Sequence, residues 1–382
     1  MYSAPYNLVI SLFSILAFLS FNYKKAEAKN YYVVFFIYLI FFGFRGYVGS
    51  DFFMYYELFH NLPEFDTNWS YKIIEGLELE KGFLLYMTFI KTLCSDYSFF
   101  VFINCLINIT CILLFIRRYS SNVALSIIIF LEIGGLVFET DVLRNMKAML
   151  IFLLSIKYIE QKRLLPYFLL NCIGFTFHSS SIIYFPMYWI LNKPIGLKKF
   201  WLLFILGNVV FLGQIHILSM MITPTLSLLG GRFALLQSNY LDTGILSDYG
   251  LTMGYFLRIA VAVLISFYYD SLIKLKPYNV IFLNALMIYL LLFCYFSEIR
   301  ILAIRMTNLF FFSYAVIIPQ IVSLLHIRNN QLIYIGLICI ISMLKVRGKT
   351  NIPIYEYDSV LFEHKGPYER KMNGYDFYMK IE

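Results

Sequence analysis

Long apolar stretches separated by short polar segments occupy most of the chain. The runs at about 31–44, 98–116, 122–138 and 142–156 are continuous, and similar runs recur towards the C-terminal end. A continuous run of roughly 18 residues fits one bilayer crossing as a helix, whereas a strand of a membrane barrel alternates with period two. The pattern therefore predicts an all-α, polytopic integral membrane protein.

Basic residues in the polar segments indicate which ends of the runs face the cytoplasm. Cytoplasmic loops are enriched in Lys and Arg, so an even number of crossings separates any two of them. The markers are Lys24/Lys25/Lys29, Arg117/Arg118, Lys157/Lys162/Arg163, Lys193/Lys198/Lys199, Lys274/Lys276 and a weaker one at Arg328. Threading the chain through them predicts about twelve crossings. The first run lacks a basic flank before it, so we expect an uncleaved first helix with its N-terminus outside.

Parity also decides two segments that length leaves open. The run at about 82–94 is interrupted by Lys91, and an extra crossing there would break parity, so we expect an interfacial or re-entrant segment at the outer face. The stretch from Leu164 to Asn192 fits one long helix or two short ones. Two helices keep both basic flanks inside and place His178 at an outer turn, so parity favours a hairpin.

The expected organisation is one membrane domain, 1–345, with an outer loop at about 223–250 and a C-terminal tail, 346–382. The last run, 331–344, then exits and leaves the tail outside. Lys345, Arg347 and Lys349 conflict with the charge rule in this arrangement.

Composition supports the membrane class. Hydrophobic residues make up 60% of the 382 residues and charged residues 14%, against about 45–50% and about 25% in soluble domains, and the mean hydropathy is +0.72. The net charge of +8 comes mainly from the loops between apolar runs, so it does not indicate a nucleic-acid partner. The six cysteines lie in apolar context without CxxC spacing, which argues against a metal site or a disulfide framework.

A group of arginines falls at or near the outer ends of the predicted helices, where the charge rule selects against them. The group consists of Arg45, Arg144, Arg232, Arg258, Arg300 and Arg305. The guanidinium fork matches phosphate oxygens bidentately, so these side chains are candidates for a diphosphate clamp. The plainer interpretations are that Arg45 snorkels from a helix end and that Arg232 and Arg258 are ordinary loop charges.

Acidic residues and a histidine fall on the same predicted face. His178 suits acid–base chemistry near neutral pH, and Asp51 follows Gly49-Ser50 and precedes a run of aromatics that includes Tyr55. The plainer alternatives are that Asp51 pairs with an arginine and that His178 only holds a serine-rich turn. No paired aspartates of the kind that bind a metal stand on this face, so we expect no metal and no other cofactor.

Two blocks of sequence resemble a known family. The stretch "FRGYVGSDFFMYYELF" is similar to the Arg-x-x-x-Gly-(Thr/Ser)-Asp-x-x-x-Tyr signature of EpsG-like and Wzy-type polysaccharide polymerases, with Arg45, Gly49, Ser50, Asp51 and Tyr55 in place. The stretch from "DVLRNMKAML" to "FHSSSIIYFP" resembles the family's second block, in which an arginine opens a helix and a later hairpin turns on His-Ser. The matching positions are Arg144 and His178 with Ser179, and "RNMKA" departs from the usual Arg-Gln.

The resemblance implies a bacterial inner-membrane polymerase of O-antigen, capsular or exopolysaccharide repeat units, with a GT-C-like glycosyltransferase architecture and its active site at the periplasmic face. Such an enzyme transfers a growing glycan from undecaprenyl diphosphate to a lipid-linked repeat unit, with inversion and without a metal. A chain-length regulator is an expected partner. Both His178 and Asp51 are candidates for the base, and the sequence slightly favours His178.

Other classes remain open from the sequence. A flippase of lipid-linked oligosaccharides has a similar number of helices, but it needs charges deep in a central cavity rather than at one face. An O-antigen ligase or a histidine-dependent acyltransferase works at the same face, and a ligase also needs a diphosphate clamp. A purely structural scaffold does not explain the outer arginines.

Overall fold

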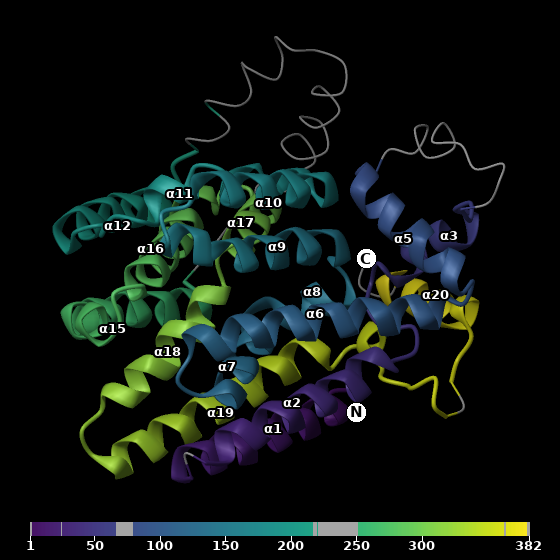
Figure 1. Cartoon of the computed structure of the whole chain (residues 1–382), viewed down its shortest axis with the longest axis horizontal. Coiled ribbons are helices and arrows are strands. Elements are labelled where there is room, and N and C mark those ends of the chain that lie inside the picture. Colours follow the sequence, from purple (N-terminus) through teal and green to yellow (C-terminus); the bar gives the residue numbers. More distant parts are fainter. Residues whose placement is uncertain are drawn as a thin grey trace. The chain divides into compact units, whose positions relative to one another are not determined.

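A computed structural model describes residues 2–23, 25–65, 79–216, 220, 251–362 and 364–379. These residues form helices and no β-strand, which confirms the all-α prediction (Figure 1). The chain divides into two compact units. The first comprises Met1–Tyr188 and Tyr314–Glu382, and the second comprises Trp189–Ser313.

The first unit is built on long helices that run between two ends. They are α1 (Ala4–Asn22), α2 (Ala26–Tyr38) continued by the π-helical turn η1 (Leu39–Gly43), α6 (Tyr97–Tyr119), α9 (Leu143–Glu160), α10 (Leu164–Phe177) and α19 (Arg328–Thr350). A further long helix, Val123–Thr140, consists of α7 (Val123–Phe130), the π-helical turn η2 (Leu131–Gly135) and α8 (Leu136–Thr140). Three shorter helices gather at one end, as Figure 1 shows: α3 (Phe52–Asn61), α5 (Lys81–Leu93) and α20 (Pro367–Met379). The helix α18 (Phe312–Leu324), which contains Pro319, precedes α19.

Side-chain contacts bring the basic markers of this unit to the opposite end. Arg118 at the end of α6 pairs with Glu160 at the end of α9 over 3.0 Å. Arg328 at the start of α19 donates to Asn22 at the end of α1 over 2.7 Å. Within the first unit, these basic loops therefore lie at one end, and the turns that hold the family-like blocks lie at the other.

Lys345 and Lys349 conflict with the charge rule in the predicted topology, and polar contacts give a structural reason for their position. Lys345 pairs with the buried Glu132 in η2, and Ser342 donates to the same carboxylate over 3.0 Å. Lys349 donates to the carbonyl oxygen of Glu132 over 2.6 Å. The backbone of a π-helical turn leaves carbonyl groups free for such donors. The two lysines are thus bound to a neighbouring helix, which provides a structural reason for their position.

Six helices of the described chain are long and apolar enough to cross a membrane, and the bent pair Leu302–Asn308 and Phe312–Leu324 makes a seventh, with an angle of 55°. The multi-pass prediction is confirmed, and the number of about twelve stays a prediction. The α5 helix has 13 residues, too few to cross at 1.5 Å per residue, as the parity argument expects.

The predicted hairpin at 164–192 is formed only in part. The α10 helix ends at the expected turn, since His178 follows its last residue. The returning segment is a 3₁₀ helix, Ser179–Tyr184, followed by the four-residue α11 (Met187–Ile190). His178 therefore lies in a tight, ordered turn, and the return is not a regular second helix.

The second unit contains α12 (Leu197–Leu212), α15 (Met253–Leu275), α16 (Asn279–Phe296) and α17 (Arg300–Asn308). The α16 helix packs against the other three. Close approach of α12 and α16 depends on Gly207, where an added Cβ would lie 3.0 Å from the side chains of Cys294 and Tyr295.

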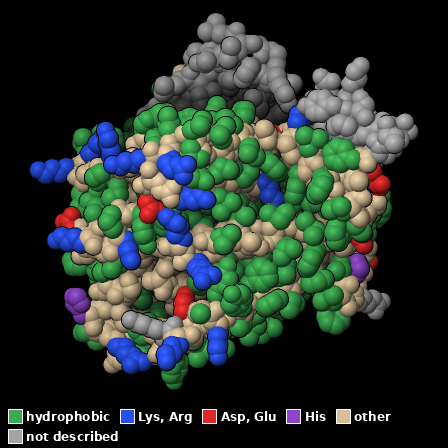
Figure 2. All heavy atoms as spheres, in the orientation of Figure 1, with side chains coloured by type: hydrophobic (Ala, Val, Ile, Leu, Met, Phe, Trp, Pro, Cys, Tyr) green, Lys and Arg blue, Asp and Glu red, His purple; other side chains and the backbone are tan. Residues whose placement is uncertain are grey.

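Apolar side chains cover wide areas of the molecular surface (Figure 2). Phe267 is 80% exposed and Leu165 is 69% exposed. Soluble proteins rarely expose such large contiguous apolar areas, whereas lipid accepts them. The surface therefore agrees with helices that face a bilayer.

Candidate functional site

Arg45 is buried in the first unit, with 5% of its surface exposed. Its Nη1 donates to the Phe42 carbonyl oxygen and its Nη2 to the Glu139 carbonyl oxygen, each over 2.6 Å. Its Nη1 also lies 3.5 Å from Glu139 Oε1. Neither the snorkelling interpretation nor an exposed clamp describes this geometry. Arg45 joins the end of η1 to the end of α8.

A network of buried polar groups surrounds Glu139. Its Oε2 accepts hydrogen bonds from the Tyr38 hydroxyl over 3.0 Å and from the Asn108 amide over 2.9 Å. The Lys147 ammonium donates to Asn108 Oδ1 over 2.6 Å. Buried charges are tolerated when they are paired and hydrogen-bonded, as here. Lys147 was not among the predicted site residues, and its one sequence signal is a lysine within the apolar α9 run.

Asp141 organises the turn before α3. Its Oδ1 accepts the N–H and the hydroxyl of Ser50 and the N–H of Asp51, the last over 3.2 Å. Gly49 has φ +101°, and a Cβ there would lie 2.4 Å from Asp141 Oδ1. Only glycine adopts this conformation readily and leaves room for the carboxylate. The turn holds Asp51 directly before the first residue of α3.

The C-terminal tail packs on this same turn. The Tyr355 hydroxyl donates to Asp141 Oδ2 over 2.9 Å, and the Gly49 N–H donates to the Ile354 carbonyl oxygen over 3.1 Å. Arg370 Nε donates to the Tyr47 carbonyl oxygen over 2.8 Å. The tail and the Arg45–Asp51 segment therefore lie on the same side of the first unit.

Arg144 lies at the centre of a second polar cluster. Its Nη1 is paired with Glu80 Oε2, and the buried Tyr55 is an electrostatic neighbour of the guanidinium. Glu80 Oε1 accepts the Ser179 N–H over 3.1 Å. Burial favours a higher pKa for Glu80, but the Ser179 N–H and the Arg144 guanidinium outweigh it and hold the pKa below its ordinary value. Glu80 stays a carboxylate at neutral pH. Glu80 was not among the predicted site residues, because no sequence pattern distinguishes it from other surface acids.

His178 is held by the serine turn that follows it. Its Nδ1 accepts the Ser180 N–H over 3.1 Å and lies 2.8 Å from the Ser180 hydroxyl. A backbone N–H only donates, so Nδ1 is the unprotonated nitrogen and, in neutral imidazole, Nε2 carries the proton. In this geometry the Nε2 side of His178 is a hydrogen-bond donor.

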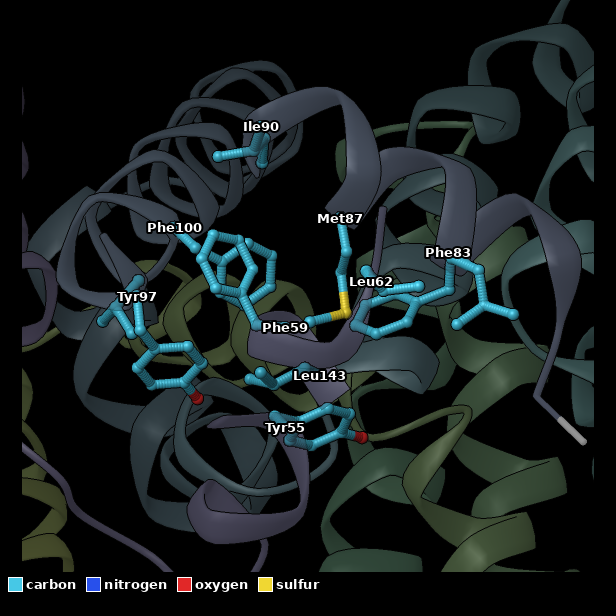
Figure 3. Close-up of a cluster of buried hydrophobic side chains, with 11 residues drawn as sticks. Tyr55, Phe59, Leu62, Phe83, Met87, Ile90, Tyr97, Phe100 and Leu143 are labelled. Atoms are coloured by element: carbon cyan, nitrogen blue, oxygen red, sulfur yellow. The ribbon is translucent and has the colours of Figure 1, made fainter. Parts of the chain in front are cut away.

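A cluster of aromatic and aliphatic side chains positions Tyr55 (Figure 3). It joins α3, α5 and the start of α6 and α9 through Tyr55, Phe59, Leu62, Phe83, Leu84, Met87, Ile90, Tyr97, Phe100, Val101 and Leu143. The Tyr55 ring packs on Phe83 at 5.7 Å between ring centroids. Aromatic pairs of this kind prefer edge-to-face geometry and are rigid. The cluster therefore holds the Tyr55 ring in place.

The remaining predicted arginines do not join this cluster among the described contacts. Arg258 in the second unit donates to the Gly254 carbonyl oxygen over 3.0 Å, and its guanidinium lies 3.8 Å from the centre of the Phe293 ring. Arg305 is exposed on α17. Arg300 begins α17, but its side chain lies outside the described part, and so do Arg232 and all but one residue of the 217–250 segment.

Within the described ranges, no three His, Cys, Asp or Glu side chains are grouped to hold a metal ion. The donor groups of the clusters are guanidinium, ammonium, amide, phenol, imidazole, hydroxyl and backbone N–H. Such groups bind anionic oxygens rather than cations. The clusters can therefore stabilise negative charge and, through Asp51, accept a proton.

The helices and these clusters define a polytopic membrane protein with polar sites at the end of the first unit away from the basic loops. The chain belongs to the EpsG family, whose model matches residues 28–359. This is a family of polysaccharide polymerase-like membrane proteins, so the resemblance noted in the sequence is confirmed. Comparisons with curated proteins and with solved structures gave no significant match.

Proposed function

We propose that the protein polymerises oligosaccharide repeat units linked to undecaprenyl diphosphate, at the periplasmic face of the bacterial inner membrane, in O-antigen, capsular or exopolysaccharide synthesis. One observation carries the proposal. Arg144 is paired with Glu80, and Glu80 accepts the Ser179 N–H beside His178, so the two ends of the second family-like block meet at one polar cluster. Asp51 and Tyr55 of the first block are electrostatic neighbours of this cluster.

The proposed reaction is an inverting glycosyl transfer without a metal. The acceptor hydroxyl oxygen bonds to the anomeric carbon of the donor glycan, and the bond from that carbon to the diphosphate oxygen breaks. The diphosphate leaves with the electron pair, and Arg144 stabilises its charge. The proton of the acceptor hydroxyl passes to a base in the site.

The hydrogen bond between Ser180 and His178 bears on which residue is the base. Because Nδ1 already accepts the Ser180 N–H, neutral His178 presents a donor at Nε2. We therefore propose Asp51 as the base and His178 as a donor to a phosphate or sugar oxygen, the reverse of the assignment that the sequence slightly favours. Arg300 and Arg305 remain proposed phosphate ligands, as do Arg232 and Arg258, and Arg45 is proposed to act by holding the Asp51 turn.

A complemented deletion strain tests the function. Wild type should restore a ladder of long-chain surface polysaccharide, whereas Arg144→Ala and Asp51→Asn should leave single repeat units at equal membrane abundance. Arg163→Ala, at the other end of the first unit, is the control and should restore the ladder. A deletion strain that still makes long chains would falsify the polymerase assignment.

The same strain separates the rival functions. Loss of a ligase leaves long chains unattached on the lipid carrier, and loss of a flippase leaves repeat units on the cytoplasmic side. Either phenotype would replace the polymerase proposal. A chain-length regulator is a further proposed partner, and the 223–250 segment is the proposed site of glycan selection.

A further inference from the structure

The Glu80 carboxylate occupies a position that suits a bound anion. Its Oε2 is paired with the Arg144 guanidinium. Its Oε1 accepts the Ser179 N–H over 3.1 Å and lies 3.4 Å from the Ser179 hydroxyl oxygen. A guanidinium, a backbone N–H and a hydroxyl are the donors with which proteins bind phosphate oxygens. Glu80 therefore holds the groups that an incoming phosphate would need.

The Glu80 carboxylate leaves part of the hydrogen-bonding capacity of these donors unused. The Nε of Arg144 is buried and has no hydrogen-bond partner among the described residues. The side chains of Arg144 and Glu80 remain 22% and 19% exposed, so the pair is open to solvent on one side. A diphosphate carries more charge and more acceptor oxygens than one carboxylate, so it can satisfy the fork more fully.

The position of Glu80 in the chain allows its carboxylate to move. Glu80 lies outside α5, directly before its first residue, Lys81. The helix is held by its own apolar face in the cluster of Phe83 and Met87. A rotation of the Glu80 side chain therefore does not require the α5 core to unpack.

We propose that Glu80 is an internal stand-in for a diphosphate, and that a diphosphate headgroup displaces it from Arg144 and Ser179 on binding. The inference rests on the proposed function for the identity of the headgroup. In the absence of a diphosphate, the Glu80 carboxylate occupies the anion site and closes it. Weakly charged anions then fail to open the site, because they do not compete with a carboxylate already held by three donors.

Binding of two probes to the purified protein in nanodiscs tests this inference. The probes are inorganic pyrophosphate and geranylgeranyl diphosphate, measured by calorimetry. Glu80→Gln removes the competing charge, and we expect both probes to bind about threefold to tenfold more tightly than to wild type. Glu160→Gln is the matched control, since Glu160 also pairs with an arginine but at the other end of the unit. It should bind both probes as wild type does.

Arg144→Ala and Ser179→Ala should weaken both probes, which identifies the donors. Tighter binding of the isoprenyl probe than of pyrophosphate identifies the lipid headgroup as the ligand, and equal affinity identifies free diphosphate. Unchanged or weaker binding to folded Glu80→Gln overturns the inference. If Glu80→Gln does not fold, Glu80→Asp takes its place, because the shorter side chain weakens the ion pair with Arg144. Tighter binding of the probes to Glu80→Asp supports displacement, and unchanged or weaker binding excludes it.

The outcome is separable from that of the proposed function. Long-chain polysaccharide in the complemented strain reports the polymerase, and probe affinity reports Glu80. A ladder that depends on the protein, together with unchanged affinity in Glu80→Gln, rejects the stand-in and leaves the polymerase in place.

Discussion

Arg45 binds two carbonyl oxygens and a carboxylate in the interior of the first unit. Arg45→Ala leaves the fully buried Glu139 carboxylate without its cation, and such losses cost about 3–5 kcal/mol. We expect the variant to lose thermal stability and membrane abundance together with activity. Thermal unfolding of the detergent-purified protein, followed by size-exclusion chromatography, measures the effect.

A control variant and a double variant show whether the loss of stability in Arg45→Ala comes from the unpaired Glu139. Arg305→Ala, at an exposed position, should unfold at the wild-type temperature. The double variant Arg45→Ala/Glu139→Gln should be less destabilised than the sum of the single variants, because the unpaired charge is removed. Wild-type stability in Arg45→Ala, combined with loss of chain extension, would instead return Arg45 to direct phosphate binding.

The Glu80 pair predicts a pH dependence of stability. The folded-state pKa of Glu80 lies below the ordinary value of 4.5. A group with a lowered folded pKa stabilises the protein at all pH values above its unfolded pKa, and this contribution disappears as the pH falls through the folded pKa. We expect wild type to unfold at a higher temperature than Glu80→Gln at pH 6–8. The difference should shrink below about pH 4.5, and a difference that grows on acidification would contradict the assigned pair.

The two residue clusters also show what a sequence can reveal. Arg45, Asp51, Arg144 and His178 were predicted as site residues because a charge or an imidazole next to an apolar run needs a reason. Their contacts were not foreseeable, since Glu139 stands 94 positions from Arg45 and Glu80 stands 64 positions from Arg144. Only the packing of helices brings such pairs together.

At the scale of elements, the C-terminal tail is hydrogen-bonded to the Arg45–Asp51 turn, and we expect these contacts to stabilise the turn. Hydrogen bonds join the Gly46 N–H to the Asp358 carbonyl oxygen over 3.0 Å and Arg370 Nε to the Tyr47 carbonyl oxygen over 2.8 Å. Arg370→Ala removes a buried cation whose Nη1 also lies 2.8 Å from Glu356. We expect the Gly46 and Gly49 amides to exchange about tenfold faster, as a loss of about 1.4 kcal/mol would produce.

Hydrogen exchange with mass spectrometry in nanodiscs measures this effect. Glu369→Ala, the exposed neighbour of Arg370, is the control and should leave the exchange unchanged. Unchanged protection of the turn in Arg370→Ala would show that the tail only rests on it.

The elements themselves were largely predictable, because apolar runs long enough to cross a bilayer have few alternatives to a helix. The α10 helix ends at the expected turn before His178, and α5 is too short to cross a membrane, whereas the regular second helix of the hairpin did not form. The packing of the tail on this turn was not predictable. The tail residues after α19 carry no apolar period, and the turn that they contact, near position 46, lies about 300 residues away in the sequence.

For the first unit as a whole, the contacts separate a basic end from the end that holds the polar clusters. Arg118, Glu160 and Arg328 lie at one end, and Asp141 and the tail at the other. Because basic loops remain in the cytoplasm, we expect the tail and the Asp51 turn to face the periplasm.

Cysteine labelling of a variant without the six native cysteines tests this orientation. Glu369→Cys lies in the tail and Gln161→Cys in the turn after α9, and both positions are exposed. A membrane-impermeant maleimide should label Glu369→Cys in intact spheroplasts and label Gln161→Cys only after the membrane is permeabilised. The reverse order would place the polar clusters in the cytoplasm and contradict the proposed periplasmic site. Labelling of both positions in intact cells would mean that the helices between them do not cross the membrane as their contacts imply.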